Sequence, residues 1–326
     1  MTNDELLTAH EPPVFVNNVL PYLKQWRDQG YRTALVTLIA RDGSSPRSIG
    51  AQMAVSEHGD SVGHIAADCF GAALVNEARS VINHGRNQVV RFGKGSKYLD
   101  IRLPCGSGLD IYFDQALEDE VLQTALDLQD ARRPFSLITN LQSGSTTIAK
   151  HELQPHVITA QGQFERPYLP LLRLLIAGTG PTVYYLASLA RSLDVDVEIF
   201  TPDKVLQVKL HRSGFLPTNL ASPRDEIDSD CDPFTAVILA FHDHDWEPLL
   251  LPQLLSHNPF YVGAIGSRKA HARRLAELEA LGVPKKTRSR IRGPVGLIAS
   301  SRSPTEIALS VLAEIVAKAR ERGMLC

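Results

Sequence analysis

The sequence predicts an α/β protein with two domains: an N-terminal α+β domain and a C-terminal Rossmann-like domain built on a parallel sheet. The chain has 326 residues, about twice the usual length of one domain. The stretch Leu174–Gly180 combines an apolar strand with a glycine turn, and it begins only after the midpoint of the chain. Beyond it, strand-like and helix-like segments alternate, which is typical of a parallel sheet with crossover helices.

In the N-terminal domain, apolar residues at three- and four-residue spacing predict a helix around Val14–Asp28, and a second helix is expected over Gly71–Asn83. The segment Arg41–Gly50 is rich in Gly, Ser and Pro and predicts a loop that carries two arginines. Apolar and β-branched stretches predict the strands. These lie at Thr33–Ala40, Met53–Ser56, Tyr98–Leu103, Leu109–Phe113, Pro134–Thr139 and Ser145–Ala149.

A linker is expected over Phe164–Pro170, because two prolines in four residues favour an extended path. The predicted domains are therefore residues 1–165 and 166–326. In the second domain, a helix is expected over Val183–Leu193. Its strands are expected at Leu171–Ala177, Val195–Phe200, Ala236–Phe241 and Phe260–Ile265.

The last helix has a clear start signal. Ser303 occupies the N-cap position, Pro304 the first helical position and Glu306 the third, which together form a capping box. An apolar stripe at helical spacing follows.

Composition excludes several classes of protein. The net charge of −2 gives no broad basic field for nucleic acid. The N-terminus has no signal-peptide core, and no apolar run is long enough for a membrane span. We expect a soluble, cytoplasmic protein with neither nucleic acid nor membrane as a partner. The four cysteines lack metal or disulfide spacing, which favours a reducing compartment; they are Cys69, Cys105, Cys231 and Cys326.

The late glycine turn matches a dinucleotide-binding turn only in part. Gly178 and Gly180 fit the first two glycines, but Val183 stands at the third small position. Pro181 removes a backbone N–H from the turn. The acidic residue that would hold a ribose is also displaced, since Asp203 lies two positions beyond its expected place. A nucleotide site and a purely structural turn both remain open.

Two polar segments follow later strands of the predicted sheet. His242 and Asp243 begin a His-Asp-His-Asp run that could line the ligand crevice, hold a metal or shuttle a proton. Ser267 and Arg268 open a helix after the next strand. They predict either an anion site or a capped helix with solvated charges.

The order of motifs along the chain resembles the XdhC/CoxI family, which are accessory factors of xanthine dehydrogenase and related molybdenum hydroxylases. The resemblance extends from about Ala34 to Ala317. The motifs are Gly43-Ser44-Ser45-Pro46-Arg47, Gly63, Cys69, Cys105-Gly106, Gly178-Thr179-Gly180, His242-Asp243-His244-Asp245, Gly263-Ala264-Ile265-Gly266-Ser267-Arg268, Gly293-Pro294-Val295-Gly296-Leu297 and Ser303-Pro304-Thr305-Glu306-Ile307-Ala308.

This resemblance implies a dimeric, cytoplasmic chaperone with an XdhC/CoxI-type first domain. It would bind the molybdenum cofactor, support its sulfuration by a cysteine desulfurase and insert it into a client apo-enzyme of the xanthine dehydrogenase or aldehyde oxidase type. By the same resemblance, Cys69 is the leading contact to molybdenum or sulfur, Cys105 a second thiol and Arg47 an anion contact. A soft thiolate and a guanidinium suit a molybdenum dithiolene that ends in a phosphate.

The chain departs from the family pattern in places. Ala66-Ala67-Asp68 replaces the glycines before Cys69, and Ser300-Ser301 replaces glycine near the last helix. Two alternatives remain: an NAD(P)-dependent oxidoreductase that uses the glycine turn and the His-Asp run, and a docking subunit without cofactor. In the second domain, the residues expected to line a crevice for the nucleotide portion of the cofactor, or to face the other domain, are Gly178, Gly180, His242, Asp243, Ser267 and Arg268.

Overall fold

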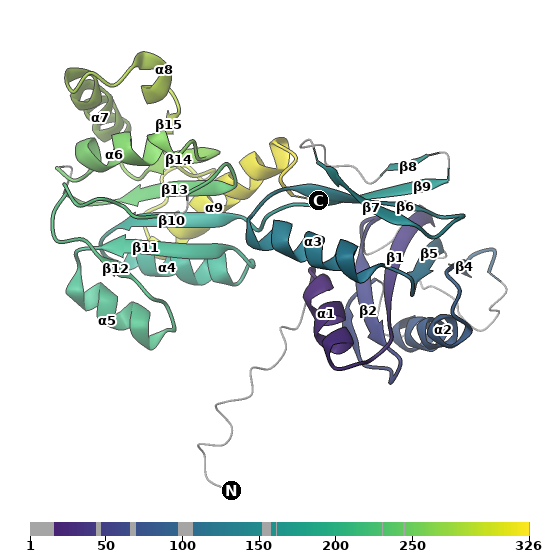
Figure 1. Ribbon diagram of the computed structural model, residues 1–326. Coiled ribbons are helices and arrows are strands. Elements are labelled where there is room, and N and C mark those ends of the chain that lie inside the picture. Colours follow the sequence, from purple (N-terminus) through teal and green to yellow (C-terminus); the bar gives the residue numbers. More distant parts are fainter. Residues whose placement is uncertain are drawn as a thin grey trace, which may run out of the picture. The chain divides into compact units, whose positions relative to one another are not determined.

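The computed structural model describes residues 16–43, 47–65, 70–96, 107–151, 158–160, 162–229, 231–243 and 245–325. The chain divides into two compact units, one extending to Leu169 and the other spanning Pro170–Leu325 (Figure 1). Each unit has its own sheets and its own buried core.

The first unit contains a five-stranded antiparallel sheet in the order β3-β2-β1-β5-β4. Alternate residues of β1 point to opposite faces, as the period of a strand requires. Ala34, Val36 and Leu38 share a core with α2, whereas Leu35 joins a core with α1 and α3. The elements are β1 (Thr33–Asp42), β2 (Gln52–Ser56), β3 (Ser61–Gly63), β4 (Gln88–Gly93), β5 (Gly108–Asp114), α1 (Leu20–Asp28), α2 (Gly71–His84) and α3 (Asp119–Asp130).

A second antiparallel sheet of this unit has the order β7-β6-β9-β8 and comprises β6 (Phe135–Asn140), β7 (Thr146–Lys150), β8 (Ile158–Ala160) and β9 (Gln163–Tyr168). The predicted linker over Phe164–Pro170 is therefore wrong for most of its length. The segment is extended, but it forms β9 and pairs with β6. Phe164 and Tyr168 are buried, and the Tyr168 ring stacks on Phe135 at 4.9 Å between centroids.

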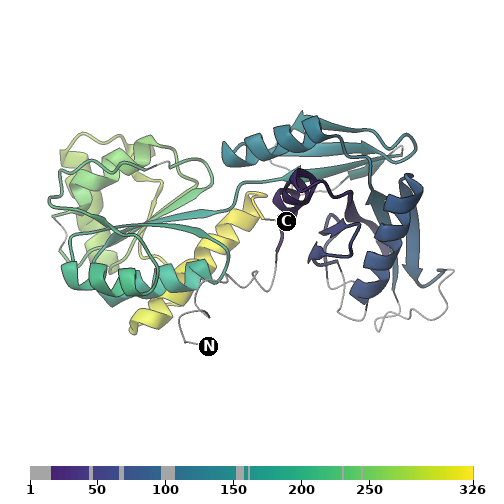
Figure 2. The same ribbon diagram turned by 60° about the horizontal axis from the view of Figure 1, so that its bottom comes forward.

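The second unit is a doubly wound α/β domain. Its six parallel strands have the order β12-β11-β10-β13-β14-β15, so the first strand in the chain lies centrally and the order reverses beside it, as in a Rossmann fold. Figure 2 shows helices on both faces of this sheet. The strands are β10 (Arg173–Gly178), β11 (Asp196–Thr201), β12 (Thr218–Asn219), β13 (Thr235–Ala240), β14 (Tyr261–Ala264) and β15 (Ile291–Arg292).

The two faces of this sheet have different cores. α6 and α7 share a core with Leu175, Ala177, Val237 and Leu239, while α4 packs against α9. Every residue of β10 and β13 is buried, which is why these strands read as continuous apolar runs. The helices are α4 (Pro181–Arg191), α5 (Lys204–Arg212), α6 (Glu247–Ser256), α7 (Arg268–Ala280), α8 (Lys285–Arg288) and α9 (Pro304–Glu321).

Some predicted boundaries differ from the structure. The first helix begins at Leu20, and the described residues before it are not helical. Leu109–Phe113 lies within β5, which pairs with β1 and with the unexpected β4; the other predicted strand, Tyr98–Leu103, lies outside the described residues. α3 and α5 were also not expected from the sequence.

The start of α9 confirms half of the predicted capping box. The hydroxyl of Ser303 accepts a hydrogen bond from the backbone N–H of Glu306 at 3.2 Å. The Glu306 carboxylate accepts from the N–H of Arg302 at 3.4 Å, instead of from that of Ser303. Within the described part of the chain, no helix combines the length and apolar character needed to cross a lipid bilayer.

Candidate functional site

Three connections leave the same end of the five-stranded sheet. Because neighbouring strands are antiparallel, the last residue of β1, Asp42, pairs with Gly108 at the start of β5, and Gly108 pairs with Gly93 at the end of β4. Gly63 at the end of β3 pairs with Met53 near the start of β2. The connections β1–β2, β3–α2 and β4–β5 therefore begin at one end, and they contain Arg47, Cys69 and Cys105, respectively.

The bases of these connections contact one another. A Cβ placed on Gly43 would lie 3.2 Å from the Cβ of Ser107, so the β1–β2 connection meets the end of the β4–β5 connection. Phe70, which follows the β3–α2 connection, packs edge-to-face on Phe92 of β4 at 4.8 Å. Cys69 and Cys105 themselves lie outside the described residues. The structure thus brings together the segments that flank the predicted thiols.

Arg47 is half-buried at this end of the sheet. Its Nη2 donates a hydrogen bond to Oδ1 of Asn17 at 3.0 Å. Desolvation by burial lowers the pKa of the Arg47 guanidinium from its usual value. An arginine nevertheless stays charged at neutral pH, so Arg47 keeps the positive charge that the anion-contact prediction requires.

A second guanidinium reinforces the same end. Arg91 of β4 makes two 3.0 Å hydrogen bonds from Nη1 to the carboxylate of Asp110, and its Nη2 lies 3.6 Å from Asp42. Its Nε donates to the carbonyl of Lys94 at 2.8 Å. A side chain at Gly108 would overlap this guanidinium, so glycine is required there. Arg91 therefore holds the ends of β1, β4 and β5 together.

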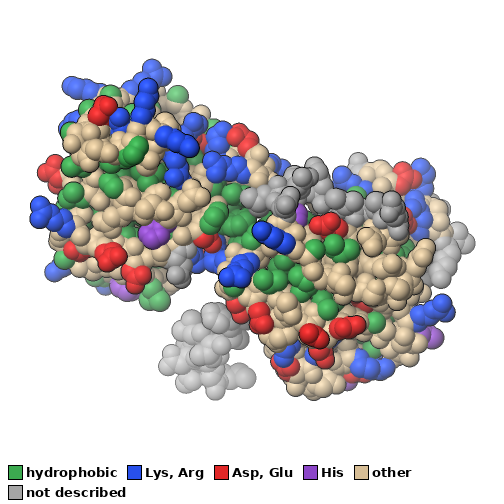
Figure 3. Space-filling model, turned by 45° about the horizontal axis from the view of Figure 1, so that its top comes forward, with side chains coloured by type: hydrophobic (Ala, Val, Ile, Leu, Met, Phe, Trp, Pro, Cys, Tyr) green, Lys and Arg blue, Asp and Glu red, His purple; other side chains and the backbone are tan. Residues whose placement is uncertain are grey.

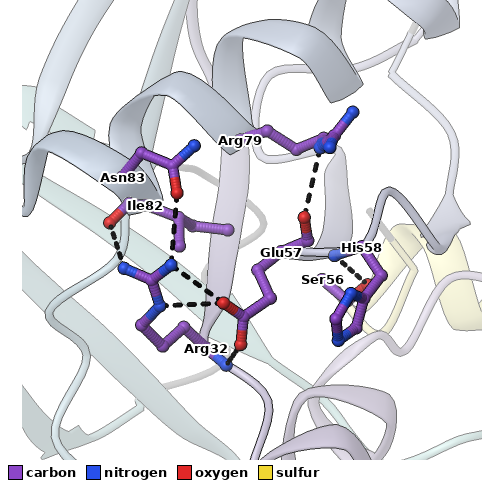
Figure 4. Close-up of polar contacts among 7 residues, drawn as sticks. All are labelled: Arg32, Ser56, Glu57, His58, Arg79, Ile82 and Asn83. Carbon is purple, nitrogen blue, oxygen red and sulfur yellow. Dashed lines mark hydrogen bonds and ion pairs between the residues drawn. The ribbon is translucent and has the colours of Figure 1, made fainter.

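The opposite end of the sheet carries a different polar cluster (Figure 4). Arg32 contacts Glu57 through its Nη2 at 2.8 Å and also reaches Asn83 of α2 at 3.2 Å. Hydrogen bonds from the backbone and the guanidinium of Arg32 lower the pKa of the Glu57 carboxyl. This cluster joins the β2–β3 turn to α2 and contains none of the predicted site residues.

In the second unit, Gly178, Gly180 and His242 meet where the strand order reverses. β10 and β13 are neighbours, and Gly178 pairs with Ala240 at their carboxyl ends. A Cβ on Gly178 would lie only 2.5 Å from the carbonyl oxygen of Ala240. Gly180 has φ +77°, and a Cβ there would lie 3.5 Å from Nε2 of His242. The glycines permit close backbone approach at the place where ligands of doubly wound sheets bind.

Asp203 occupies one of the backbone donors that a dinucleotide turn would offer, the N–H of Gly180. Its Oδ2 accepts a hydrogen bond from the N–H of Gly180 at 3.3 Å. Its Oδ1 accepts from the N–H groups of Val205 and Leu206, both at 3.0 Å, and thereby caps α5. A carboxylate engaged by three backbone donors is poorly placed to bind a ribose, and its charge opposes a pyrophosphate beside Gly180.

The predicted His-Asp run is exposed where it is described. Oδ1 of Asp243 accepts a hydrogen bond from the N–H of Asp245 at 3.0 Å, so this carboxylate stabilises its own turn. His244 lies outside the described residues. Among the residues that the structure describes, no three His, Cys, Asp or Glu side chains are grouped to hold a metal ion.

Ser267 and Arg268 follow β14, the next strand along the sheet. Oγ of Ser267 accepts from the N–H of Ala270 at 3.1 Å, so Ser267 is the N-cap of α7. Arg268 is exposed at the first position of that helix. One turn further, His271 contacts Arg274, a residue that pairs with Glu247 of α6. The sequence patterns missed this trio; the only local signal is a histidine one turn after a helix cap.

These features define a class: a two-unit α/β protein with a Rossmann-type second unit and a first unit whose motif-bearing connections share one sheet end. Two family models match the chain, described as the XdhC Rossmann domain over residues 174–315 and the XdhC and CoxI family over residues 26–93. The chain belongs to the XdhC/CoxI family, and the resemblance predicted from the sequence is confirmed.

Individual relatives agree with this membership. The chain is 34% identical over 286 residues to the "Molybdenum cofactor insertion chaperone PaoD" of Escherichia coli (strain K12), covering 88% of this chain and 83% of that protein. It is 27% identical to a protein of Bacillus subtilis (strain 168) that is described as a probable component of xanthine dehydrogenase, over 54% of this chain and 51% of that protein. A crystal structure described as a xanthine dehydrogenase from Bacillus halodurans matches with a TM-score of 0.72 at 20% identity, covering 94% and 96% of the two chains, and shows the shared fold.

Proposed function

We propose that this chain is a molybdenum-cofactor chaperone that binds the cofactor and inserts it into a client apo-enzyme of the xanthine dehydrogenase or aldehyde oxidase type. The observation that carries the proposal is the common origin of the connections with Arg47, Cys69 and Cys105 at one end of the five-stranded sheet. The similarity of this chain to a molybdenum cofactor insertion chaperone, over most of both chains, supports the same function.

The residues of this end suit a pterin dithiolene that ends in a phosphate. Arg47 would contact the anionic part, because a guanidinium donates several charge-assisted hydrogen bonds. Cys69 would contact molybdenum or the sulfur bound to it, and Cys105 would supply a second soft ligand. When bound, the cofactor supplies the redox centre that the client uses; the chaperone's own residues hold and shield it.

The second unit would bind the nucleotide portion of the cofactor, if one is present, at the carboxyl end of its sheet. Gly178 and Gly180 give close backbone access there, beside His242 and Asp243. Ser267 and Arg268 lie at the start of α7 after the next strand. Because Asp203 engages the N–H of Gly180, the phosphates of a cofactor nucleotide, like the pyrophosphate of NAD(P) in the oxidoreductase alternative, would have to lie away from that N–H.

The partners follow from this function as parts of the same proposal. A cysteine desulfurase would supply the sulfur for cofactor sulfuration, and the client apo-enzyme would receive the finished cofactor. A homodimer in the cytoplasm is the form in which we expect the chaperone to act. The boundary between the two domains is expected near residue 165.

The test is to purify the protein from a host that makes the molybdenum cofactor, release bound small molecules, and assay molybdenum and oxidised pterin. The wild type should carry near-stoichiometric pterin, and Cys69→Ser should lose most of it while remaining folded. Cys231→Ser is the matched control, because burial raises the pKa of that thiol to about 11 and it lies in the second unit. Folded wild-type protein with NAD(P) and no pterin would favour the oxidoreductase; client maturation by a variant that binds no pterin would favour a docking subunit.

A further inference from the structure

A buried ion pair in the second unit holds a histidine at the carboxyl end of the sheet. Arg274 of α7 and Glu247 of α6 each have 1% of their side chain exposed. Arg274 donates from Nε to Oε2 of Glu247 at 2.7 Å and from Nη2 to Oε1 at 3.0 Å. Its Nη2 also donates to the carbonyl of Ile265 at 3.1 Å, just beyond β14. The guanidinium therefore has one orientation, and it faces His271.

This contact determines where His271 carries its proton. Nη1 of Arg274 lies 3.2 Å from Nδ1 of His271. A guanidinium has only donors, so Nδ1 must accept, and the neutral ring carries its proton on Nε2. Desolvation, followed by the charge of Arg274, lowers the pKa of His271, while Glu247 acts in the opposite direction. At neutral pH the imidazole is therefore uncharged and presents Nε2–H as a donor.

The ring lies directly against backbone. A side chain at Gly293, which follows β15, would overlap Nδ1, Cγ and Cε1 of His271. Only glycine lets the imidazole lie at this place beside the carboxyl ends of β14 and β15. Among the described residues, no group hydrogen-bonds to Nε2 of His271.

Two cations lie in the same helical segment as this donor. Arg268 and Lys269 are exposed in the same first turn of α7, and neither forms an ion pair with any described residue. Lys and Arg side chains gather over the part of the second unit that carries α7 and α8 (Figure 3). By contrast, the charge of Arg274 is offset by Glu247. The uncompensated charge thus lies on Arg268 and Lys269, which are three and two residues before His271 in α7.

We propose that His271 is a ligand-binding residue that donates from Nε2 to a phosphate-type oxyanion, with Arg268 and Lys269 supplying the opposing charge. A phosphate suits this arrangement because it offers several charged acceptor oxygens to separate donors. Arg274 is the positioning residue, since it keeps the tautomer of His271 and acts on the ligand only through it. The inference concerns the second unit alone and does not depend on Cys69 or on molybdenum binding.

The first experiment measures the tautomer and the response to inorganic pyrophosphate. Nitrogen-15 NMR of the imidazoles should show His271 with its proton on Nε2, and pyrophosphate should shift that resonance saturably. His271→Leu should weaken pyrophosphate binding about tenfold or more, the usual effect of losing a hydrogen bond to a charged group. His271→Gln should bind within a few-fold of wild type, because its amide N–H lies near the position of Nε2.

His211→Leu, at an exposed histidine of α5, is the matched control and should bind as wild type does. Wild-type protein that does not bind pyrophosphate, or His271→Leu that binds it unchanged, overturns the proposal. A proton found on Nδ1 overturns it as well, and this measurement needs no variant to fold. Cys69→Ser should retain pyrophosphate binding, so a failure of the molybdenum proposal would be seen separately in the pterin assay.

Discussion

Replacing Arg274 with methionine should destabilise the second unit strongly. The substitution removes four hydrogen bonds from the guanidinium, two of them to Glu247, and leaves that carboxylate without its bidentate partner at 1% side-chain exposure. Breaking one side of a buried pair costs about 3–5 kcal/mol. The pair Arg288–Glu279 is the exposed counterpart, since 68% of the Glu279 side chain is accessible. Removing this exposed pair should leave the free energy of unfolding nearly unchanged.

The assay can be confined to the second unit. The chain has two tryptophans, and Trp246 lies in the second unit, stacked on Phe241 at 5.2 Å. In a Trp26→Phe background, Trp246 fluorescence during urea unfolding therefore reports this unit, which avoids treating both units as one transition. All variants are compared in that background, so the effect of Trp26→Phe cancels.

A double variant tests the reason for the loss. Glu247→Leu combined with Arg274→Met replaces both charges by apolar groups, and much of the lost stability should return, because an apolar pair needs no desolvation of charge. Suppose instead that Arg274→Met lowers the free energy of unfolding by less than about 1 kcal/mol, as the loss of an exposed ion pair would. The pair would then not be buried in solution, and the positioning role assigned to Arg274 would fail with it.

Three further substitutions test other parts of the structure. Gly178→Ala should cost several kcal/mol and lower the melting temperature, because a Cβ would lie 2.5 Å from the carbonyl of Ala240; unchanged melting would contradict this close approach. Ser303→Ala should cost about 1 kcal/mol in urea unfolding by removing the cap of α9, and a neutral result would show that the cap is dispensable. Because the pKa of Glu57 is lowered in the folded protein, its carboxylate stabilises the fold at pH values above its unfolded pKa near 4.5, and this stabilisation is lost as pH falls through the folded pKa. Glu57→Gln should therefore be less stable than wild type at pH 7 and equally stable in acid. A difference in stability that does not change with pH would exclude the ion pair with Arg32.

Local patterns explain the elements that were predicted well. Strands β10 and β13 of the second unit are buried along their whole length and on both faces of the sheet, so they appear in the sequence as continuous apolar runs. The cap of α9 involves residues only three positions apart, Ser303 and Glu306, and such contacts are visible in sequence. The family resemblance extended the prediction to function, because it relied on the order of motifs rather than on any one contact.

Other features depended on distant partners. The segment Phe164–Pro170 has an extended pattern in either a linker or a strand, and only its pairing with β6 makes it β9. The sequence offers Asp203 as a displaced ribose ligand, but its position beside Gly180 makes it the cap of α5 and an acceptor for the glycine turn. The site residues Cys69 and Cys105 remain predictions, since they lie outside the described residues.

The amino-acid sequence by itself determined the class of fold, the family and the segments that carry the chemistry, because these follow from short-range periodicity and from the order of motifs. The tertiary structure alone decided which segments meet. It placed the flanks of three connections at one sheet end, and it joined Glu247, Arg274 and His271 across two helices. Such contacts depend on how strands are ordered and how helices pack, and no local pattern of residues specifies either.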